Sequence, residues 1–195
     1  MAQNFSNPGT EVVKPVKLAH IVLKTEPSKL KLMVDFYKTF LSARVVHENE
    51  FMSFLTYDAE HHRIAIIAIP TLTGPSPTAS GLLHVAFTFS SLAELLLAYR
   101  QRKEGHGIEP YWCVNHGPTT SLYYRDPDGN EIETQVENFE DPEDATRFMM
   151  GKEFEENPVG TDFDPEEWIA RLENGEKEEV LKKRVEIGRR GVPDI

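Results

Sequence analysis

The length, composition and charge of the chain narrow the classes of protein to which it can belong. Its 195 residues suffice for one domain with a sizeable core and an appendage, or for two small modules that share a core. The formal net charge of −11 disfavours nucleic acid and anionic membranes as partners, because phosphate binding needs clustered lysine and arginine.

Cysteine content and the N-terminal segment bear on the cellular compartment. The single cysteine, Cys113, excludes a disulfide within the chain and any zinc site built from several cysteines. Residues 1–15 are polar and have neither the basic start nor the apolar stretch of a secretory signal. No segment reaches the roughly 20 apolar residues that span a bilayer. We therefore expect a cytoplasmic protein, with no membrane partner and a loose N-terminal arm at 1–15.

Two segments further along the chain repeat each other at an offset of 64 residues. The run LAHIVLKT begins at Leu18, the run LLHVAFTF begins at Leu82, and both favour β structure. The offset places His20 over His84. A helical pattern follows each run, the second one beginning with a capping box. Three strands then follow each helix, at about 43–49, 51–57 and 62–69 in the first half and 109–116, 121–125 and 131–137 in the second.

These patterns predict an α+β fold in which the unit βαβββ occurs twice. The first module covers residues 16–70, the second covers 82–139, and the Pro- and Gly-rich run 71–81 links them. Two such sheets bury their apolar faces together, which predicts a barrel-like arrangement with a cleft between them. The composition changes after Phe139, and capping residues predict a helical C-terminal extension at 140–195, with three helices that begin near Asp141, Asp164 and Glu178. Trp168 is expected to pack on the core or on a second subunit, and the oligomeric state stays open.

A hairpin near the end of the second module carries polar residues of chemical interest. Its two strands flank the turn-forming sequence DPDGN. If Arg125 faces Glu131 across this turn, then Tyr123 faces Glu133 on the same side of the sheet, because directly opposed residues share a face. A tyrosine hydroxyl then lies beside a carboxylate, with His116 a short distance upstream.

Two histidines and this carboxylate form a candidate metal site. One histidine in an apolar strand is more often a hydrogen-bonded core residue than a ligand, but His20 and His84 occupy equivalent positions of a repeat. Together with Glu133 they supply two imidazoles and one carboxylate. That ligand set leaves coordination positions of Fe(II) open for substrate and dioxygen.

The hairpin also follows a spaced pattern, and a second segment accompanies it. The pattern is Val114-Asn115-His116, five residues, Leu122-Tyr123, two residues, Asp126-Pro127-Asp128-Gly129, three residues and Glu133. It resembles the signature of type I extradiol ring-cleavage dioxygenases of the vicinal oxygen chelate superfamily at every fixed position. The segment from Glu60 to Ile66 is similar to the place where that family carries a His-His pair whose second member is the acid-base residue. The resemblance covers about residues 16–139.

The resemblance implies a vicinal oxygen chelate fold and an Fe(II) enzyme that uses O₂ to open a catechol-type ring beside its hydroxyls. The implied roles are Fe(II) ligation by His20, His84 and Glu133, proton transfer by His62, and hydrogen bonding to the substrate or bound oxygen by His116 and Tyr123. A register error of one residue would exchange His61 and His62. Aromatic pocket candidates that would suit an apolar ring substituent are Phe51, Phe54, Phe87 and Trp112.

Three other functions within the same superfamily stay open. Glyoxalase-like isomerases commonly carry a further acidic ligand on the closing strand of the first module, where the offset gives Ile69 and no carboxylate is near. Fosfomycin-type thiol transferases bind Mn(II) through a similar His, His, Glu set, so His62, His116 and Tyr123 are the distinguishing residues. A metal-free small-molecule-binding module needs no such ligands.

Overall fold

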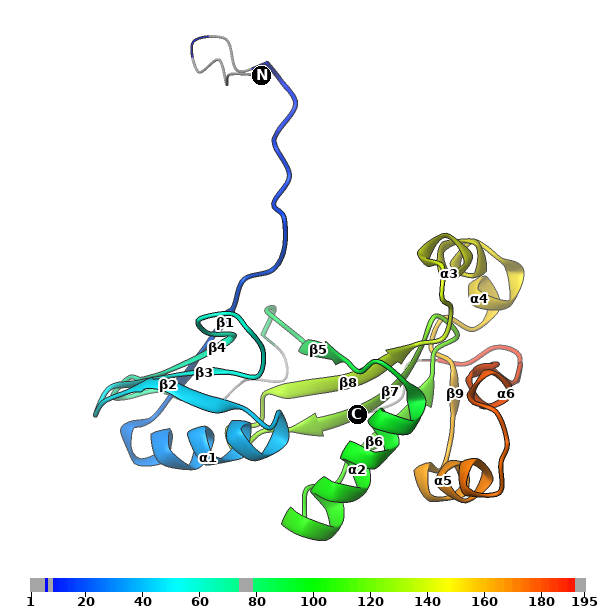
Figure 1. Ribbon diagram of the computed structural model, residues 1–195. Helices are drawn as coiled ribbons and strands as arrows, with labels where there is room; N and C mark the ends of the chain where they lie inside the picture. The colour runs from blue at the N-terminus through cyan, green and yellow to red at the C-terminus, as the bar shows by residue number, and fades with distance from the viewer. Residues whose placement is uncertain (1–5, 7–8, 74–78, 192–195) are drawn as a thin grey trace.

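The first sheet of the protein has four strands, and one helix covers it. The computed structural model describes residue 6 and residues 9–73 and 79–191 (Figure 1). In this sheet the strand order is β1-β4-β3-β2, with β1 and β4 parallel and the other neighbours antiparallel. Its elements are β1 (Ile21–Thr25), the 3₁₀ turn η1 (Pro27–Lys29), α1 (Leu30–Phe40), β2 (Arg44–Glu48), β3 (Met52–Thr56) and β4 (Ile64–Ala68).

The second sheet repeats this arrangement and gains a short fifth strand. Its order is β5-β8-β7-β6-β9, again with the first pair parallel. Figure 1 shows α1 and α2 on the same side of the two sheets, while the N-terminal arm extends away from them. The elements are β5 (His84–Thr88), α2 (Leu92–His106), β6 (Trp112–Asn115), β7 (Thr119–Arg125), β8 (Glu131–Glu137) and, from the extension, β9 (Thr161–Asp162).

The predicted α+β class with two βαβββ units is confirmed by this element order. In the described part of the chain the two sheets stay separate, and no strand pairing closes them into a barrel. The residue boundaries of the modules stay a prediction. The predicted arm, linker and extension lie partly outside the described residues, at 1–5 and 7–8, at 74–78 and at 192–195.

Local signals fix the ends of α2 as expected. The Ser91 hydroxyl accepts a hydrogen bond from the backbone N–H of Glu94 at 3.1 Å, which satisfies one of the free donors of the first turn. Gly107 ends the helix with a φ of 65°. Its buried face, which includes Leu92, Leu95 and Leu96, then packs toward β8.

One apolar core joins the two modules, and a buried arginine lies in it. The core includes side chains from α1, α2 and both sheets. Arg102 of α2 donates from Nε and Nη2 to the carbonyl oxygen of Phe40, at 2.9 and 2.6 Å, and its guanidinium lies 4.0 Å from the centre of the Phe40 ring. These contacts connect the end of α1 to α2, so the modules are attached by polar as well as apolar contacts.

The register of the hairpin agrees with the sequence, whereas the repeat offset does not hold throughout. Strands β7 and β8 pair Tyr123 with Glu133, as predicted. Glu133 lies opposite Ala86 in the second sheet, and the equivalent pair in the first is Val22 with Ala65. The predicted equivalent, Ile69, was therefore wrong, because α2 has 15 residues and α1 has 11. Ala65 is not a carboxylate either, so the first sheet still lacks an acidic ligand at this place.

The C-terminal extension differs from the predicted three helices. Its described residues, 140–191, form four helices, because α4 was missed, and one of its segments joins the second sheet as β9. Helix α6 ends at Lys182, since Lys183 leaves the helix in an extended conformation and Arg184 is buried. Trp168 packs in the core, as predicted, with 8% of its surface exposed. The helices and the interposed strand are α3 (Pro142–Met149), α4 (Lys152–Glu156), β9, α5 (Pro165–Glu173) and α6 (Glu178–Lys182).

Helix α5 is held against α2 by an ionic contact. Glu166 accepts hydrogen bonds from Lys103, Tyr99 and Arg100 at 3.0, 2.9 and 3.1 Å. The Lys103 ammonium is the main cause that lowers the pKa of Glu166 to about 2. A carboxylate whose pKa is depressed by folding stabilises the protein above its ordinary pKa, and this contribution is lost as the pH falls through the folded value.

Replacing Glu166 with glutamine should lower the free energy of unfolding at neutral pH by about 0.5–1 kcal/mol, because partly exposed ion pairs are weak. It should also flatten the dependence of stability on pH between the ordinary pKa of 4.5 and about 2. Thermal unfolding of both proteins across that pH range is the measurement. Glu173→Gln removes only one exposed contact with Arg100 and should have the smaller effect; an equal effect would contradict the assignment.

Among the described residues, no helix has both the length and the apolar character needed to cross a membrane.

Candidate active site

His84 and Glu133 meet on the second sheet. His84 is the first residue of β5, and Glu133 lies on the neighbouring strand β8. Nε2 of His84 is 3.1 Å from Oε2 of Glu133. The carboxylate is buried, with 5% of the residue exposed, whereas 30% of the His84 side chain is exposed. A buried acid thus faces a ring that remains accessible from outside.

Tyr123 and His116 continue this group. The Tyr123 ring lies edge-on to His84, with 5.4 Å between the ring centres. Its hydroxyl is 2.9 Å from Nε2 of His116, and Nδ1 of His116 is 2.5 Å from the carbonyl oxygen of Val159. Trp112 stacks on Tyr123 at 4.9 Å. The four predicted residues His84, His116, Tyr123 and Glu133 therefore form one contiguous cluster.

Burial sets the protonation of the cluster. Burial, reinforced by the negative charge of Glu133, raises the pKa of the Tyr123 hydroxyl, so the phenol remains a hydrogen-bond donor. Burial also lowers the pKa of His116, although the hydrogen bond to the Val159 carbonyl opposes this shift. Cys113, on the same strand as Trp112, has its pKa raised to about 12 by burial and is therefore a thiol that packs against the core.

A second cluster gathers the remaining predicted residues on the first sheet. The rings of His20 and His62 lie 4.4 Å apart, and His62 stacks on Phe54 at 4.9 Å. His62 is partly buried, whereas His61 is exposed and touches it through Nδ1. Burial, together with the neighbouring His20 and His61, lowers the pKa of His62. The structure thus turns the second histidine of the pair toward the other aromatic rings.

One histidine of each cluster lies at an edge strand of its sheet, His20 beside β1 and His84 on β5. β1 is the edge strand of the first sheet and β5 is the edge strand of the second. A small cavity of about 70 Å³ lies between them, lined by residues 18–21 on one side and 85–87 on the other. His20 belongs to that lining, one residue before β1, and His84 directly precedes its opposite wall.

Two of the three expected metal ligands fit a shared cation in this structure. Ligands bonded at about 2.0–2.2 Å and at right angles lie about 3 Å apart, close to the 3.1 Å between His84 and Glu133. His20 instead contacts His62. Over the described part of the chain, no three His, Cys, Asp or Glu side chains converge so as to hold a metal ion. The structure therefore brings together His84 and Glu133, and it does not bring the third expected ligand, His20, to them.

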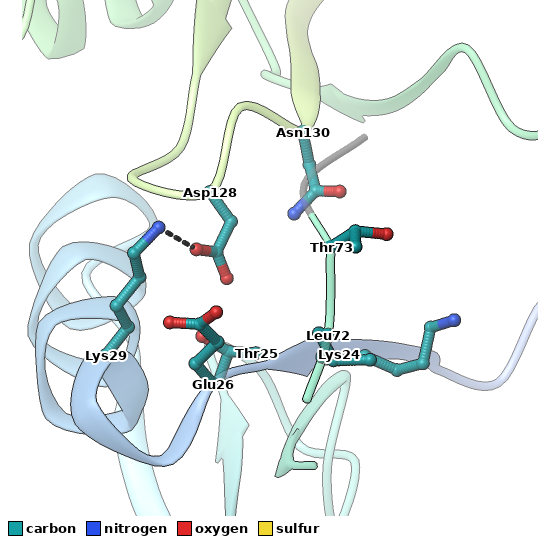
Figure 2. Close-up of a pocket in the computed structure, with 8 residues that line it drawn as sticks. All are labelled: Lys24, Thr25, Glu26, Lys29, Leu72, Thr73, Asp128 and Asn130. Carbon is teal, nitrogen blue, oxygen red and sulfur yellow. Dashed lines mark hydrogen bonds and ion pairs between the residues drawn. The ribbon is translucent and has the colours of Figure 1, made fainter. Parts of the chain in front are cut away.

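The aspartates of the spaced pattern have structural roles. Asp126 accepts hydrogen bonds from the backbone N–H groups of Asp128 and Asn130, from the Asn130 amide and from the Tyr37 hydroxyl, at 2.8–3.0 Å. Asp128 forms an ion pair with Lys29 at 2.9 Å, at the rim of a pocket of about 270 Å³ (Figure 2). The described residues that line this pocket include no histidine. The turn thus fastens the hairpin to α1, and its acids are not part of the site.

Replacing Asp126 with alanine should cost about 2–4 kcal/mol of stability, because several donors lose their acceptor, and each costs about 1–3 kcal/mol when buried. Chemical denaturation measures this. Asp128→Ala is the matched control on the same turn, and it should cost less than about 1 kcal/mol because its ion pair is partly exposed. Equal losses from the two variants would show that Asp126 does not organise the turn.

Contacts from the C-terminal extension to this site were missed at the sequence level. The carbonyl of Val159 approaches His116, and Arg184 donates to the His116 carbonyl at 3.0 Å. A backbone carbonyl leaves no signal in the residue type, and Arg184 lies in a basic run that reads as a solvated helix end. β9, only two residues long, gave no strand pattern either.

The sequence matches one protein family and two named relatives over most of its length. The family described as Glyoxalase/Bleomycin resistance protein/Dioxygenase superfamily matches residues 17–134. Biphenyl-2,3-diol 1,2-dioxygenase 2 of Rhodococcus globerulus is 49% identical over 150 residues, covering 76% of this chain and 77% of that protein. Biphenyl-2,3-diol 1,2-dioxygenase 3 of the same organism is 47% identical over 151 residues, covering 76% and 78%.

Solved structures share the fold at low sequence identity. The fosfomycin resistance protein FosX of Listeria monocytogenes is 20% identical, with a TM-score of 0.51, covering 69% of this chain and 98% of its own. A glyoxylase/bleomycin resistance protein/dioxygenase domain from Frankia sp. EAN1pec is 16% identical, with a TM-score of 0.50, covering 64% and 99%. At such low identity the similarity concerns the fold alone.

Proposed function

Because the chain belongs to the Glyoxalase/Bleomycin resistance protein/Dioxygenase superfamily, we propose that it is an extradiol dioxygenase that opens a catechol-type ring with O₂. One observation carries the proposal. A His84–Glu133 donor pair, backed by the Tyr123–His116 hydrogen bond, occurs in a chain that is 49% identical to a biphenyl-2,3-diol 1,2-dioxygenase.

The proposed cofactor is Fe(II). His84 and Glu133 would hold it, with His20 as the third ligand. Bound iron would provide the electron path between catecholate and dioxygen, chemistry that amino-acid side chains do not supply. The ligand set of two imidazoles and a carboxylate suits this metal. In this structure the His20 ring lies against His62.

The protein residues bind and orient the diol and move its protons. A catechol hydroxyl is a weak acid with a pKa near 10, so a base is needed. His62 is the proposed base, because its ring is partly buried, is oriented by Phe54 and lies next to His20. Tyr123 and His116 would hydrogen-bond the diol or the oxygen that reacts with it, because their polar atoms already face each other beside Glu133.

Two of the expected aromatic pocket residues lie beside these groups. Phe54 stacks on His62, and Trp112 stacks on Tyr123. Phe51 is 59% exposed, and the ring of Phe87 contacts Tyr57 and lines the small cavity that His20 also lines. We propose that Phe54 and Trp112 border the ring substituent of the substrate, and that a phenyl group is among the substituents accepted, as the names of the two relatives suggest.

The decisive experiment loads the protein with Fe(II) without air and then supplies catechols in air. Catechol, a methylcatechol and 2,3-dihydroxybiphenyl form the panel. We expect one O₂ consumed per diol and a coloured ring-fission product, with the aryl-substituted diol turned over best. Mn(II) loading followed by thiol transfer to fosfomycin, without oxygen uptake, would replace this proposal with the transferase alternative. Diol binding without turnover for either metal would favour a binding module.

A further inference from the structure

The C-terminal extension contacts the proposed site at Nδ1 of His116. The family match ends at residue 134, before the extension begins. The extension nevertheless returns to β6 through β9, whose Thr161 pairs with Asn115. That pairing brings the turn formed by residues 157–160 next to His116.

We propose that this 157–160 turn is a positioning element of the active site, which holds the His116 ring with its hydrogen on Nδ1 and its Nε2 toward Tyr123. A carbonyl oxygen only accepts hydrogen bonds, so the contact between Nδ1 and the Val159 carbonyl requires a hydrogen on Nδ1. In the neutral ring Nε2 then has a free lone pair and accepts from the Tyr123 hydroxyl.

A buried arginine and a buried asparagine hold the turn in place. Arg184, whose side chain is 1% exposed, donates to the carbonyl oxygens of His116, Asn157 and Glu153 at 2.7–3.0 Å. The Asn157 side chain closes the turn by bonding the N–H and the carbonyl of Gly160 at 2.8 and 3.0 Å. The Arg184 guanidinium therefore links the turn directly to the backbone of His116, the residue that the turn orients.

Gly160 allows the turn to approach. Its φ of +106° lies where residues with a side chain are strained. A Cβ atom at this position would lie 2.3 Å from the Asn115 carbonyl oxygen and 2.8 Å from the His116 Cα atom. Both neighbours are backbone atoms, which cannot rotate away. Any side chain here must therefore push the Val159 carbonyl away from His116.

A second contact from the extension supports the same role. Asp162 of β9 accepts a hydrogen bond from Nε1 of Trp112 at 2.8 Å, and Arg190 fixes that carboxylate at 2.8 Å. Trp112 stacks on Tyr123, the hydrogen-bond partner of His116. The extension thus contacts the aromatic residues of the site at two places, at His116 through the turn and at Trp112 through β9.

The test determines which nitrogen of the His116 ring carries the hydrogen. Only its last measurement, kcat after iron loading, rests on the proposed function. Long-range proton–nitrogen spectra of the full ¹⁵N-labelled chain, before iron is added, distinguish a hydrogen on Nδ1 from one on Nε2. His116→Gln identifies the signals. We expect the hydrogen on Nδ1 in the unaltered protein, and a shift toward Nε2 or an average of the two forms in Gly160→Ala.

Matched variants separate positioning from stability. Gly175→Ala makes the same change at a φ of +86° in the same extension, where a Cβ atom meets nothing within 4 Å. Arg184→Lys keeps the charge but loses most of the carbonyl contacts, so it should give the spectrum expected of Gly160→Ala. It replaces Gly160→Ala in the test if that variant folds poorly. After iron loading, kcat should fall about 10- to 100-fold in both turn variants, the usual effect of losing an orienting partner, while Gly175→Ala matches the unaltered protein.

The outcomes separate this proposal from the proposed function. A hydrogen on Nε2 in the unaltered protein, or an unchanged spectrum in both Gly160→Ala and Arg184→Lys, would overturn the positioning role. The same spectral change in Gly175→Ala would assign the effect to general destabilisation and also overturn it. The predicted spectra in a protein that shows no ring cleavage would uphold the positioning role and refute the dioxygenase.

Discussion

Replacing Glu133 with glutamine is expected to remove iron from the protein and to abolish ring cleavage. Glutamine keeps the shape of the side chain and can still bond Nε2 of His84, so folding should be preserved. It lacks the negative charge that a divalent cation needs at this buried position. Even the loss of an outer partner of a metal ligand weakens binding by about 10- to 100-fold. We therefore expect Glu133→Gln to bind Fe(II) at least about 100-fold more weakly.

Metal content after gel filtration and turnover at saturating iron measure the effect of Glu133→Gln. Glu137→Gln is the control, because Glu137 lies at the exposed end of the same strand, where its carboxylate accepts a hydrogen bond from the Gln135 amide. It should retain full iron and full turnover. Retention of stoichiometric iron by Glu133→Gln would show that the metal, if any, is held elsewhere and would remove the basis of the proposed function.

Replacing His62 with glutamine is expected to leave iron in place and to lower kcat by about 10²–10⁴-fold, the usual range for the loss of a general acid-base group. The His62 ring is packed against His20 and Phe54. A base dissolved in the surrounding water therefore cannot easily take its place. A nitro-substituted catechol ionises without help and should lose much less turnover than catechol itself. Oxygen uptake with the two substrates, at equal iron content, measures this difference.

His106→Gln provides the matched control for His62→Gln. His106 is exposed and ends α2, on an element that contributes no proposed site residue. Its replacement should change kcat by less than about twofold. If His62→Gln slowed both substrates equally, the ring would contribute to binding or packing rather than to proton transfer. If it turned over catechol normally, the proposed base would have to be sought among the other side chains of the cluster.

The parts of the fold set by local chemistry could be predicted from the sequence. Strand pairing across the DPDGN turn follows from the turn length and the alternation of side chains, and it gave the Tyr123–Glu133 pair that the structure shows. The capping box likewise marked the start of α2, where Ser91 is the N-cap residue. Such features depend on a few neighbouring residues, so one sequence is enough to find them.

The features that depend on distant contacts were harder to predict. His20 precedes β1 and is not held by the strand ladder, so its side chain direction is set by the neighbouring His62 rather than by alternation. The equivalence of Glu133 to Ile69 failed because α2 is longer than α1. Arg184 carried no signal at all, since its burial depends on carbonyl groups roughly 30–70 residues away in the chain.

The late position of Arg184 has a consequence for biosynthesis. Arg184 follows β8, the last long strand of the second sheet, by roughly 50 residues, and ribosomes add about 5–20 residues per second. Strands β1 to β8 are therefore synthesised several seconds before the residue that secures His116 is made. A nascent or prematurely terminated chain should already be compact while its histidine ring is still free to turn, so catalytic competence would be acquired after folding of the sheets rather than together with it.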